Sequence, residues 1–269
     1  MLSIIIVNFN TSQLVLDCAE SIKKYPPCCD YEIIVVDNDS RVEEKKLLEN
    51  SDLKVIFSST NDGFSKANNK GVEEASGDVL LFLNPDTVVL ENALSDTLEF
   101  LKEHKDSGIV GCRVNLESGG LDMACKRSLP TVRNAVGHYL KLNGKIKYFS
   151  GYRRLDLADD YVGEVECVVG AFMMMPRSVF LKAGKFCEDY FMYGEDVELC
   201  RSVLNLGYKV YYFGKAEIIH KKRASSHKNK RAGKAFYDSM EIYYDKHKKN
   251  CLGDIFVKTG IRIARYLGL

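Results

Sequence analysis

The sequence lacks the features that mark membrane-spanning, secreted and zinc-binding proteins. It has no uncharged apolar run of about 18 residues, so no transmembrane helix is expected. Its start, Met1-Leu2-Ser3-Ile4, lacks the basic stretch and the cleavage site of a signal peptide. Its nine cysteines form no Cys-x-x-Cys pair, which argues against zinc and redox-couple sites. We therefore expect reduced thiols in a cytoplasmic protein.

Net charge is also nearly absent. The formal charge is +1 at pH 7 over 269 residues, so the chain as a whole is not a polycation, although it contains basic segments. A chain of this length is long enough for one large core, or for one core with a small addition. The composition therefore excludes few functions, and the motifs have to decide.

The most informative stretch is the apolar run at Val79–Leu83 and the turn after it. Five consecutive apolar residues are typical of a strand buried on both faces of a parallel sheet. Pro85 ends the run, because proline cannot donate to a strand ladder. Asp86 then lies beyond the carboxyl end of a central strand, where open α/β sheets bind ligands. Asp86 is a candidate ligand for Mg2+ or Mn2+ on a substrate phosphate. A turn that merely caps the next helix explains this stretch about equally well.

Strands and helices alternate along the first part of the chain. Apolar runs at residues 2–7, 31–36 and 54–58 are separated by helical patterns at 12–24 and 43–50, and another helix follows residue 64. This alternation indicates right-handed βαβ units and a parallel sheet, so the predicted class is α/β. Three of the strands end in Asn or Asp clusters. These clusters predict one shared polar crevice at the carboxyl edge of the sheet.

Later segments add candidate site residues. Gly170 and Ala171 follow an apolar run, and such small residues let a ligand approach the backbone closely. Glu195 and Asp196 fall in the first turn of a predicted helix, where the macrodipole favours ionised carboxylates. Acids that merely stabilise the helix end are the simpler interpretation of this pair alone. A histidine after a strand is usually structural, but basic residues follow His220 and strengthen the case for a phosphate-facing role.

The carboxyl-terminal region is basic and amphipathic. Residues 228–249 combine lysines with aromatic residues and predict one helix, and residues 255–269 mix apolar and basic side chains. The second segment suits a helix on an anionic membrane face, and a terminal helix packed on the domain fits equally well. Nucleic-acid binding by residues 228–249 is disfavoured, because no known binding module accompanies the helix. Between residues 116 and 160 the weak pattern indicates a loop region.

Taken in order, these motifs resemble the family 2 glycosyltransferases with the GT-A fold, especially bacterial rhamnosyltransferases that use dTDP-rhamnose. The resemblance runs from residue 2 to about residue 220 and rests on the order of the motifs rather than on one of them. It implies a mostly parallel, Rossmann-like sheet flanked by helices. It also implies a GT-A domain at residues 1–225 with a helical extension at residues 226–269.

The resemblance assigns donor-binding roles to the strand-end motifs. The family's metal motif is usually Asp-x-Asp, but here it is Asn84-Pro85-Asp86, the form found in rhamnosyltransferase-like members. Asp86 must then supply the metal contact, and His220 resembles the family's late metal- or phosphate-contacting histidine. The residues expected to bind the nucleotide are Asn8, Asn10, Asp37, Asp39, Asn61, Gly63, Phe64, Asn68 and Asn84.

The resemblance also assigns the chemistry. Asp196 matches the family's general base, Glu195 would orient the acceptor, and Gly170 and Ala171 would contact the acceptor or the sugar. The implied reaction is metal-dependent, inverting transfer from a nucleotide-sugar, either dTDP-rhamnose or a UDP-sugar. L-Rhamnose from dTDP-β-L-rhamnose is the best match. A glycan or lipid-linked glycan would be the acceptor, in cell-surface polysaccharide synthesis. The protein would be cytoplasmic, or peripheral on the cytoplasmic membrane face, with Mg2+ or Mn2+ as cofactor and no nucleic-acid partner.

Two alternatives come from other classes. A nucleotidylyltransferase also binds nucleotides on an α/β sheet, but it needs a glycine-rich, basic loop after the first strand. Residues 8–12, Asn-Phe-Asn-Thr-Ser, contain neither a glycine nor a cation. A sugar-nucleotide-binding module without catalysis is the second alternative, and the presence of both Asp86 and Asp196 weighs against it.

Overall fold

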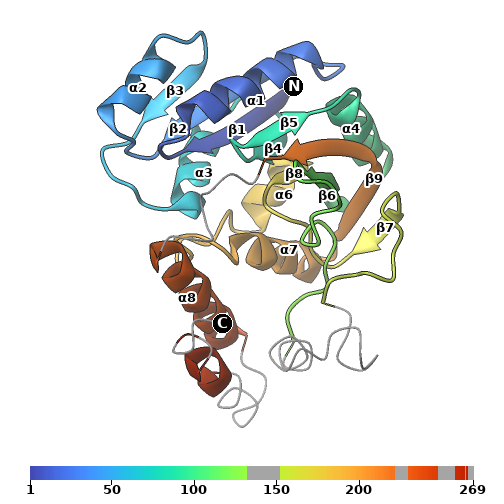
Figure 1. Cartoon of the computed structure of the whole chain (residues 1–269). Coiled ribbons are helices and arrows are strands. Elements are labelled where there is room, and N and C mark those ends of the chain that lie inside the picture. Colours follow the sequence, from blue (N-terminus) through green and yellow to red (C-terminus); the bar gives the residue numbers. More distant parts are fainter. Residues whose placement is uncertain (132–151, 222–229, 248–257, 264, 266–269) are drawn as a thin grey trace.

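The apolar run at Val79–Leu83 forms a strand, β4, inside a nine-stranded sheet in the computed structural model of this chain (Figure 1). The structure describes residues 1–131, 152–221, 230–247, 258–263 and 265. β1 pairs with β4 on one side and β8 pairs with it on the other. Because β4 is also covered on both faces, a continuous apolar sequence is what its position requires.

The amino-terminal half of the sheet is parallel, in the spatial order β3-β2-β1-β4. Its first three strands are β1 (Leu2–Asn8), β2 (Tyr31–Asp37) and β3 (Lys54–Phe57). The helices that connect these strands are α1 (Ser12–Lys24), α2 (Val42–Glu49) and α3 (Phe64–Glu73). The predicted βαβ units are therefore confirmed, and the strand order reverses at β1, where such sheets open a crevice.

The other half of the sheet is mixed. β8 (Phe172–Pro176) runs antiparallel to both β4 and β6 (Ser107–Leu116), and β9 (Lys209–His220) runs parallel to β6. The short strands β5 (Thr87–Val89) and β7 (Val162–Val165) run antiparallel to β9. The α/β class is confirmed, while the predicted parallel arrangement holds for the amino-terminal half. A strand buried on both faces reads as the same apolar run in either direction, so the pattern does not encode its direction.

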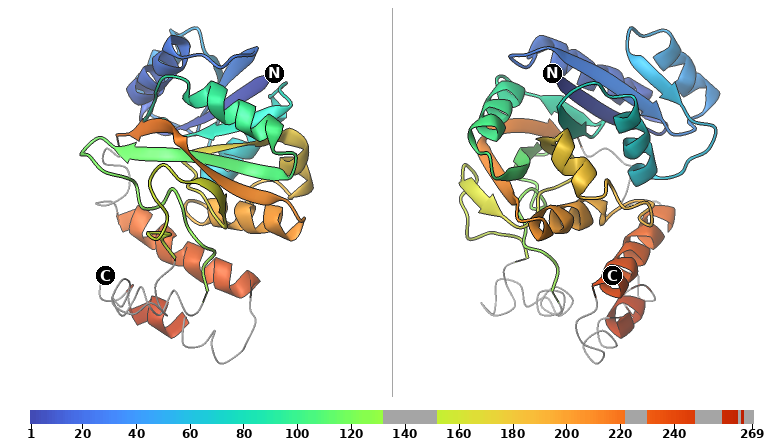
Figure 2. Two further views of the ribbon diagram at one scale, coloured as in Figure 1. Left: turned by 90° about the vertical axis from the view of Figure 1, so that its right-hand side faces the viewer. Right: turned by 180° about the vertical axis from the view of Figure 1, so that it is seen from behind.

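β9 is one long strand where the sequence pattern indicates two short runs. Cys112 of β6 pairs with Phe213, but the next residue, Arg113, pairs with Glu217. Extra residues in one strand bend it and increase its twist, and the β9 ribbon curves across the sheet in Figure 2. Beyond this irregularity β9 reaches β5, where His220 pairs with Thr87. The bend therefore carries His220 to the turn that follows β4.

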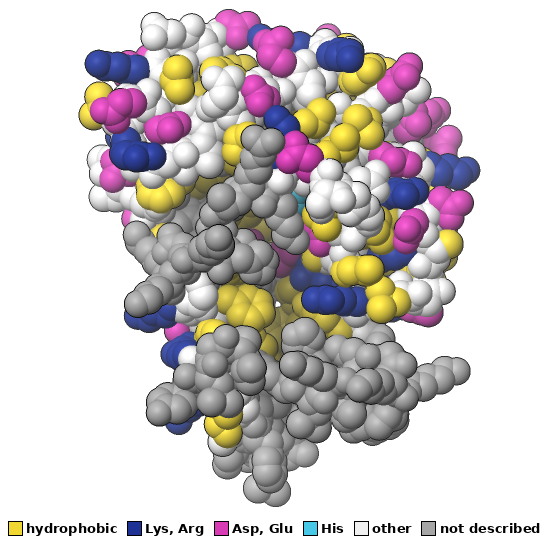
Figure 3. Space-filling model, in the orientation of Figure 1, with side chains coloured by type: hydrophobic (Ala, Val, Ile, Leu, Met, Phe, Trp, Pro, Cys, Tyr) yellow, Lys and Arg dark blue, Asp and Glu magenta, His cyan; other side chains and the backbone are white. Residues whose placement is uncertain are grey.

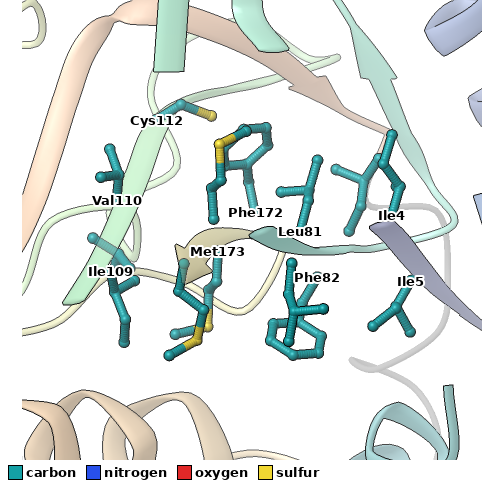
Figure 4. Close-up of a cluster of buried hydrophobic side chains, with 14 of the residues drawn as sticks. Ile4, Ile5, Leu81, Phe82, Ile109, Val110, Cys112, Phe172 and Met173 are labelled. Carbon is teal, nitrogen blue, oxygen red and sulfur yellow. The ribbon is translucent and has the colours of Figure 1, made fainter. Parts of the chain in front are cut away.

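Helices cover both faces of the sheet (Figures 1 and 2). α1 and α4 (Ala93–Glu103) lie on one face, and α3, α6 (Arg177–Lys182) and α7 (Glu195–Asn205) lie on the other. Figure 4 shows how neighbouring strands fill both layers from alternate positions. One layer receives the fully buried Ile4, Leu81 and Phe172, and the other receives the fully buried Ile5, Phe82 and Met173.

Helix α8 (Lys230–Lys246) packs against α7 and extends away from the sheet (Figure 1). Tyr243 joins the main core, and its hydroxyl accepts a 2.8 Å hydrogen bond from Nε of Arg201 on α7. Tyr237 and Tyr244 of α8 form a second small cluster with Ile261, in the helical residues 258–263. The two predicted carboxyl-terminal helices are confirmed in their described parts.

Two sequence predictions fall outside the described residues. The boundary at 225/226 lies within residues 222–229, and residues 132–151 of the weakly patterned region at 116–160 are also outside the described part. Among the described residues, no helix is both long and apolar enough to cross a membrane. On the face shown in Figure 3, acidic and basic side chains are interspersed over the sheet-containing part, in line with the near-zero net charge.

Candidate active site

Side chains tie the ends of β1 and β2 together. Asn8 donates from Nδ2 to Asp37 Oδ2 over 2.7 Å and to Ser12 Oγ over 3.0 Å. Its Oδ1 accepts from the backbone N–H of Thr11. Asp37 accepts in addition from the backbone N–H of Ser40, and both Asn8 and Asp37 are fully buried. These two predicted nucleotide-binding residues are therefore buried and fix the loops that follow β1 and β2.

The next residues along each loop reach closer to solvent. Asn10 and Asp39 both have left-handed backbones, with φ of 57° and 64°, a conformation that Asn and Asp adopt more easily than most residues. Asn10 Oδ1 accepts from the backbone N–H of Arg41 over 2.9 Å. Asp39 is exposed and accepts from Lys45 Nζ over 3.1 Å. Of the two acids predicted to bind the nucleotide, Asp37 is buried and Asp39 is exposed.

The loop at residues 61–64 is held by Asn38. Its Nδ2 donates to Asn61 Oδ1 over 3.0 Å and to the carbonyl of Gly63 over 3.2 Å. Asn61 Oδ1 also accepts from the Gly63 N–H. The backbone N–H of Phe64 then donates to the carbonyl of Phe191 over 2.7 Å. The predicted donor loop is thereby joined to the segment that leads into α7.

Gly63 and Asn69 fix the contact between α3 with its preceding loop and the segment that leads into α7. Gly63 has φ 92° and ψ 177°, and an added Cβ would lie 2.4 Å from the Phe191 carbonyl oxygen. Asn69 Nδ2 donates to the carbonyl of Phe186 over 2.9 Å, and its Oδ1 accepts from the Phe186 N–H. The predicted Asn68 instead donates to the Phe64 carbonyl within its own helix. The neighbouring asparagine is thus the one that connects α3 to the distant segment.

The turn after β4 brings Asp86 and His220 together across 134 residues of sequence. Asp86 Oδ1 lies 2.9 Å from His220 Nε2, and both side chains are buried. The β5–β9 pairing sets this contact, since Thr87 is opposite His220 and the Lys221 N–H donates to the Asp86 carbonyl. The side chain of Asn84 makes no hydrogen bond within the described part of the chain.

Two carboxylates surround His220. Burial alone would lower its pKa, but Asp122 and Asp86 outweigh burial and raise the pKa of His220 to about 9. Its Nδ1 lies 3.7 Å from Asp122 Oδ2, so this contact is electrostatic rather than a hydrogen bond. Among the described residues, no group of three or more His, Cys, Asp and Glu side chains is placed to hold a metal ion. A metal at this turn would therefore need oxygen ligands from a substrate as well.

The geometry of the pair does fit a divalent ion. Neighbouring ligands on an octahedral ion with bonds of about 2.1 Å lie about 3 Å apart. Asp86 Oδ1 and His220 Nε2 are separated by 2.9 Å. A carboxylate oxygen and an imidazole nitrogen are also donors that Mn2+ accepts. Once a metal ion displaces the proton between His220 and Asp86, the two residues could therefore occupy adjacent positions of one coordination shell.

The Glu195–Asp196 pair opens helix α7. Asp196 Oδ2 accepts from Arg127 Nη2 over 2.6 Å and from the Gly170 N–H over 3.2 Å, while Oδ1 accepts from the Val197 N–H over 2.8 Å. Glu195 Oε2 is buried and has no hydrogen-bond partner among the described residues. Burial and the nearby charge of Asp196 raise the pKa of Glu195 to about 8. The two adjacent carboxyl groups thus have very different surroundings.

Gly170 and Ala171 connect the two parts of the site. The Gly170 N–H donates to Asp196, and the carbonyl of Ala171 accepts from the Asn84 N–H over 3.1 Å. A Cβ added at Gly170 would lie 3.5 Å from Asp196 Cβ and 3.9 Å from Glu195 Oε1. The Asp86 turn and the carboxyl pair are therefore separated by two consecutive residues without large side chains.

Several residues of this site were not predicted from the sequence. Arg127 and Asp122 lie in the weakly patterned region, where no periodicity singles out a residue. Asn38 and Asn69 stand beside predicted residues, and the local pattern does not distinguish the asparagine that crosses to another segment. Phe191 contributes a backbone carbonyl, which its side-chain type does not reveal.

The Asn and Asp loops at the strand ends, the Asp86–His220 turn and the buried Glu195–Asp196 pair all lie on a sheet of the GT-A type. Residues 3–181 match the family model described as Glycosyl transferase family 2, and the chain belongs to this family. The resemblance inferred from the motif order is therefore confirmed at the level of family and fold.

The alignments with two curated relatives are longer than the segment that matches the family model. The chain is 28% identical over 216 residues to the low-salt glycan biosynthesis hexosyltransferase Agl10 of Haloferax volcanii, covering 77% of this chain and 64% of that protein. It is 25% identical over 197 residues to the rhamnosyltransferase WbbL of Escherichia coli, covering 71% of this chain and 72% of that protein. The chain thus spans less than two thirds of the length of the Haloferax relative.

Solved structures share the fold at lower identity. The mannosyltransferase PcManGT from Pyrobaculum calidifontis, in complex with GDP-Man and Mn2+, aligns with a TM-score of 0.62 and 15% identity, covering 100% of this chain and 70% of that chain. GalNAc-T7 with UDP, GalNAc and Mn2+ aligns with a TM-score of 0.65 and 16% identity, covering 91% of this chain and 48% of that chain. These likenesses confirm the GT-A architecture.

We predict that Gly63→Ala costs clearly more stability than Gly119→Ala. Both glycines have nearly the same φ, 92° and 93°, but nothing lies within 4 Å of a Cβ at Gly119. A positive φ strains alanine at both positions by roughly 1–3 kcal/mol, and the ψ of 177° at Gly63 adds to that strain, because essentially only glycine adopts this region. At Gly63 the collision with the Phe191 backbone should add about 1–3 kcal/mol. The free energy of unfolding in urea measures both changes, and equal losses would show that the Phe191 contact contributes nothing.

Proposed function

We propose that this protein is an inverting, metal-dependent glycosyltransferase that uses a nucleotide-sugar donor. The observation that carries the proposal is the pair of hydrogen bonds made by Gly170 and Ala171, one to Asp196 and one to the Asp86 turn. Sugar transfer needs a place that holds the leaving diphosphate and a base close to it. Asp86 on one side of this short segment is a candidate for holding the diphosphate, and Asp196 on the other side is a candidate base. The family includes named glycosyltransferases.

Asp86 and His220 would hold Mg2+ or Mn2+, together with oxygens of the donor diphosphate. The 2.9 Å separation of their donor atoms supports this assignment, and so does the need for substrate oxygens to complete the shell. When bound, such an ion neutralises the charge that grows on the departing diphosphate. Mn2+ is present in the structures of PcManGT and GalNAc-T7, which share the fold.

Asp196 would act as the general base. The acceptor hydroxyl passes its proton to an Asp196 carboxylate oxygen, and the acceptor oxygen forms a bond to C1 of the sugar. The bond from C1 to the diphosphate oxygen breaks, and its electron pair leaves with the nucleoside diphosphate. One displacement without an enzyme nucleophile inverts the anomeric centre. A β-linked L-rhamnose donor would thus give an α-linked rhamnoside.

The donor we propose is dTDP-β-L-rhamnose. Asn84 stands where relatives often have a carboxylate near the ribose, and a deoxyribose presents one hydroxyl fewer, so a neutral amide suits a thymidine nucleotide. The similarity to WbbL, which is named a rhamnosyltransferase, supports this choice. The names of relatives in glycan and O-antigen biosynthesis support a glycan or lipid-linked glycan as acceptor.

Peripheral contact with the cytoplasmic membrane face is part of the proposal. The helical residues 258–263 bury Ile261 against α8 but leave Arg262 and Ile263 exposed, with Ile263 54% exposed. A basic and an apolar side chain that face solvent together are suited to an anionic lipid surface. Lipid-linked acceptors would be found at such a surface.

We predict that nucleotide binding depends on metal and on Asp86. In calorimetric titrations, dTDP should bind the wild-type protein at least about tenfold more tightly with Mn2+ than with EDTA, because the metal links the protein to the phosphates. Asp86→Asn should abolish this difference, and Asp52→Asn, in an exposed ion pair with Lys23, should keep it. A parallel panel of sugar nucleotides, scored by release of nucleoside diphosphate, identifies the donor. Metal-independent binding in the wild type would contradict the assignment, and UDP binding tenfold tighter than dTDP would contradict the thymidine donor.

We predict that Asp196→Asn abolishes transfer and retains donor binding. The amide keeps the shape of the side chain but cannot accept a proton, so turnover should fall by about a hundredfold or more. Arg127 loses its buried counter-ion, so stability should also fall, by about 3 kcal/mol. Melting temperature, dTDP affinity and turnover on the same sample separate these effects. A folded variant that binds dTDP and turns over at the wild-type rate would exclude Asp196 as the base.

We predict that Ile263→Glu weakens binding to anionic vesicles. A carboxylate at this exposed apolar position is repelled by the lipid surface, and affinity for phosphatidylglycerol vesicles should fall about fivefold, the equivalent of about 1 kcal/mol. Leu206→Glu, the same change at an exposed residue after α7, should leave sedimentation unchanged. If the wild-type protein does not sediment with the vesicles, the membrane assignment is wrong.

A further inference from the structure

Arg127 is a buried arginine directed at Asp196. Its backbone exchanges two 2.9 Å hydrogen bonds with Cys167, so its Cα is fixed in a short antiparallel bridge. Its Nη2 donates to Asp196 Oδ2 over 2.6 Å and to the carbonyl of Val168 over 2.8 Å. The Arg127 and Asp196 side chains are 10% and 11% exposed. A charge buried in this way is costly unless it is paired.

The neighbouring cation, Lys126, does not bond to Asp196 and contacts a different part of the structure. Lys126 is buried too, but its Nζ donates to the carbonyls of Leu157 and Ala158 over 2.6 and 2.7 Å and contacts Asp159. The two side chains contact different parts of the structure, as their separate partners show. One buried cation therefore secures a loop, and the next contacts the carboxyl pair.

Two adjacent carboxyl groups in a buried site can share one proton. For one of them to act as the base, that group must be ionised while the other carries the proton. Arg127 hydrogen-bonds to Asp196 and not to Glu195, whose Oε2 is buried without a partner among the described residues. The N–H groups of Gly170 and Val197 add donors to Asp196 alone. Three donors thus stabilise negative charge on Asp196, whereas the backbone N–H of Glu195 is the hydrogen-bond donor that lowers the pKa of the Glu195 carboxyl.

We propose that Arg127 is a positioning residue that holds Asp196 ionised and correctly oriented, so that the proton shared by the pair resides on Glu195. This inference rests on the proposed function, in which Asp196 receives the proton of the acceptor hydroxyl. It adds a division of roles: Asp196 accepts the proton, and the protonated Glu195 can donate a hydrogen bond to an acceptor oxygen.

The other titratable groups near Asp196 do not supply the same effect. Tyr152 lies within 3.4 Å of Arg127 Nη1, and burial raises the pKa of its phenol. Burial likewise raises the pKa of the Cys167 thiol well above its usual range. Both groups are therefore neutral near pH 7 and contribute no charge. Among the described groups around the carboxyl pair, Arg127 is the cation in direct contact.

The experiment compares Arg127→Gln, Arg127→Lys and Lys126→Gln with the wild-type protein. Its activity readout is the pH profile of dTDP release from dTDP-rhamnose, or from the donor that the panel identifies. Arg127→Gln should move the acidic limb of the profile to higher pH by about one unit or more, because a carboxylate without its cation binds protons more tightly. It should also lower the plateau by tenfold or more as orientation is lost. Arg127→Lys keeps the charge, so its limb should stay in place while the plateau falls.

Lys126→Gln is the matched control, since it removes an equally buried cation and its hydrogen bonds to a different part of the structure. Its acidic limb should coincide with that of the wild type. Coincident limbs in Arg127→Gln and the wild type would overturn the proposal.

A spectroscopic titration needs neither turnover nor a folded Arg127→Gln protein. Carboxyl carbons of 13C-labelled Asp196 and Glu195 in the wild-type protein, assigned with Asp196→Asn and Glu195→Gln, should show at pH 7 an ionised Asp196 and a protonated Glu195. The reverse distribution would overturn the proposal, whatever the activity. If the titration agrees but no donor turns over, the proposed function fails while the ionised Asp196 and protonated Glu195 of the proposal stand, and the same titration of Arg127→Gln then tests the part played by Arg127.

Discussion

Two backbone hydrogen bonds from adjacent residues set the geometry of this site. Gly170 donates to the carboxylate that begins α7, and Ala171 accepts from the turn that ends β4. Backbone groups have little freedom, so the distance between the two polar centres is determined by peptide geometry rather than by flexible side chains. A Cβ at position 170 would be in van der Waals contact with both residues of the carboxyl pair, 3.5 Å from Asp196 Cβ and 3.9 Å from Glu195 Oε1. The rest of the fold positions the other polar groups relative to these two hydrogen bonds.

The other groups of the site come from distant parts of the chain, and a different structural feature positions each of them. The bent β9 brings His220 to Asp86, the Gly63 contact with Phe191 joins the donor loop to the segment before α7, and Asn69 secures that segment at Phe186. Among the described residues, buried charged groups lie around His220 and around Asp196, and Lys126 is a further buried cation beside the second group. A buried ion pair is weak evidence for stability, because desolvation offsets most of its attraction.

The sequence was sufficient for the amino-terminal half of the fold because its signals are local. Continuous apolar runs marked β1, β2 and β4, and the Asn/Asp clusters after them meet as expected, with Asn8 bonded to Asp37. Asp86 and His220 were paired through the order of family motifs, since nothing in the local pattern links residues so far apart. The direction of β8 was not readable from its apolar run, and β5, with 3 residues, is too short to give a pattern. Arg127 was missed because its role depends on a contact with α7, which periodicity in its own segment cannot reveal.

The position of β8 has a consequence for synthesis on the ribosome. β8 lies between β4 and β6 in the sheet but follows both of them in the chain. Until residues 172–176 emerge, the apolar edge of β4 has no partner on that side. Translation from residue 83 to residue 172 at about 5–20 residues per second takes roughly 5–20 s. An unpaired apolar edge that persists for seconds invites pairing with other chains, so the nascent protein should be a client of ribosome-associated chaperones during this interval.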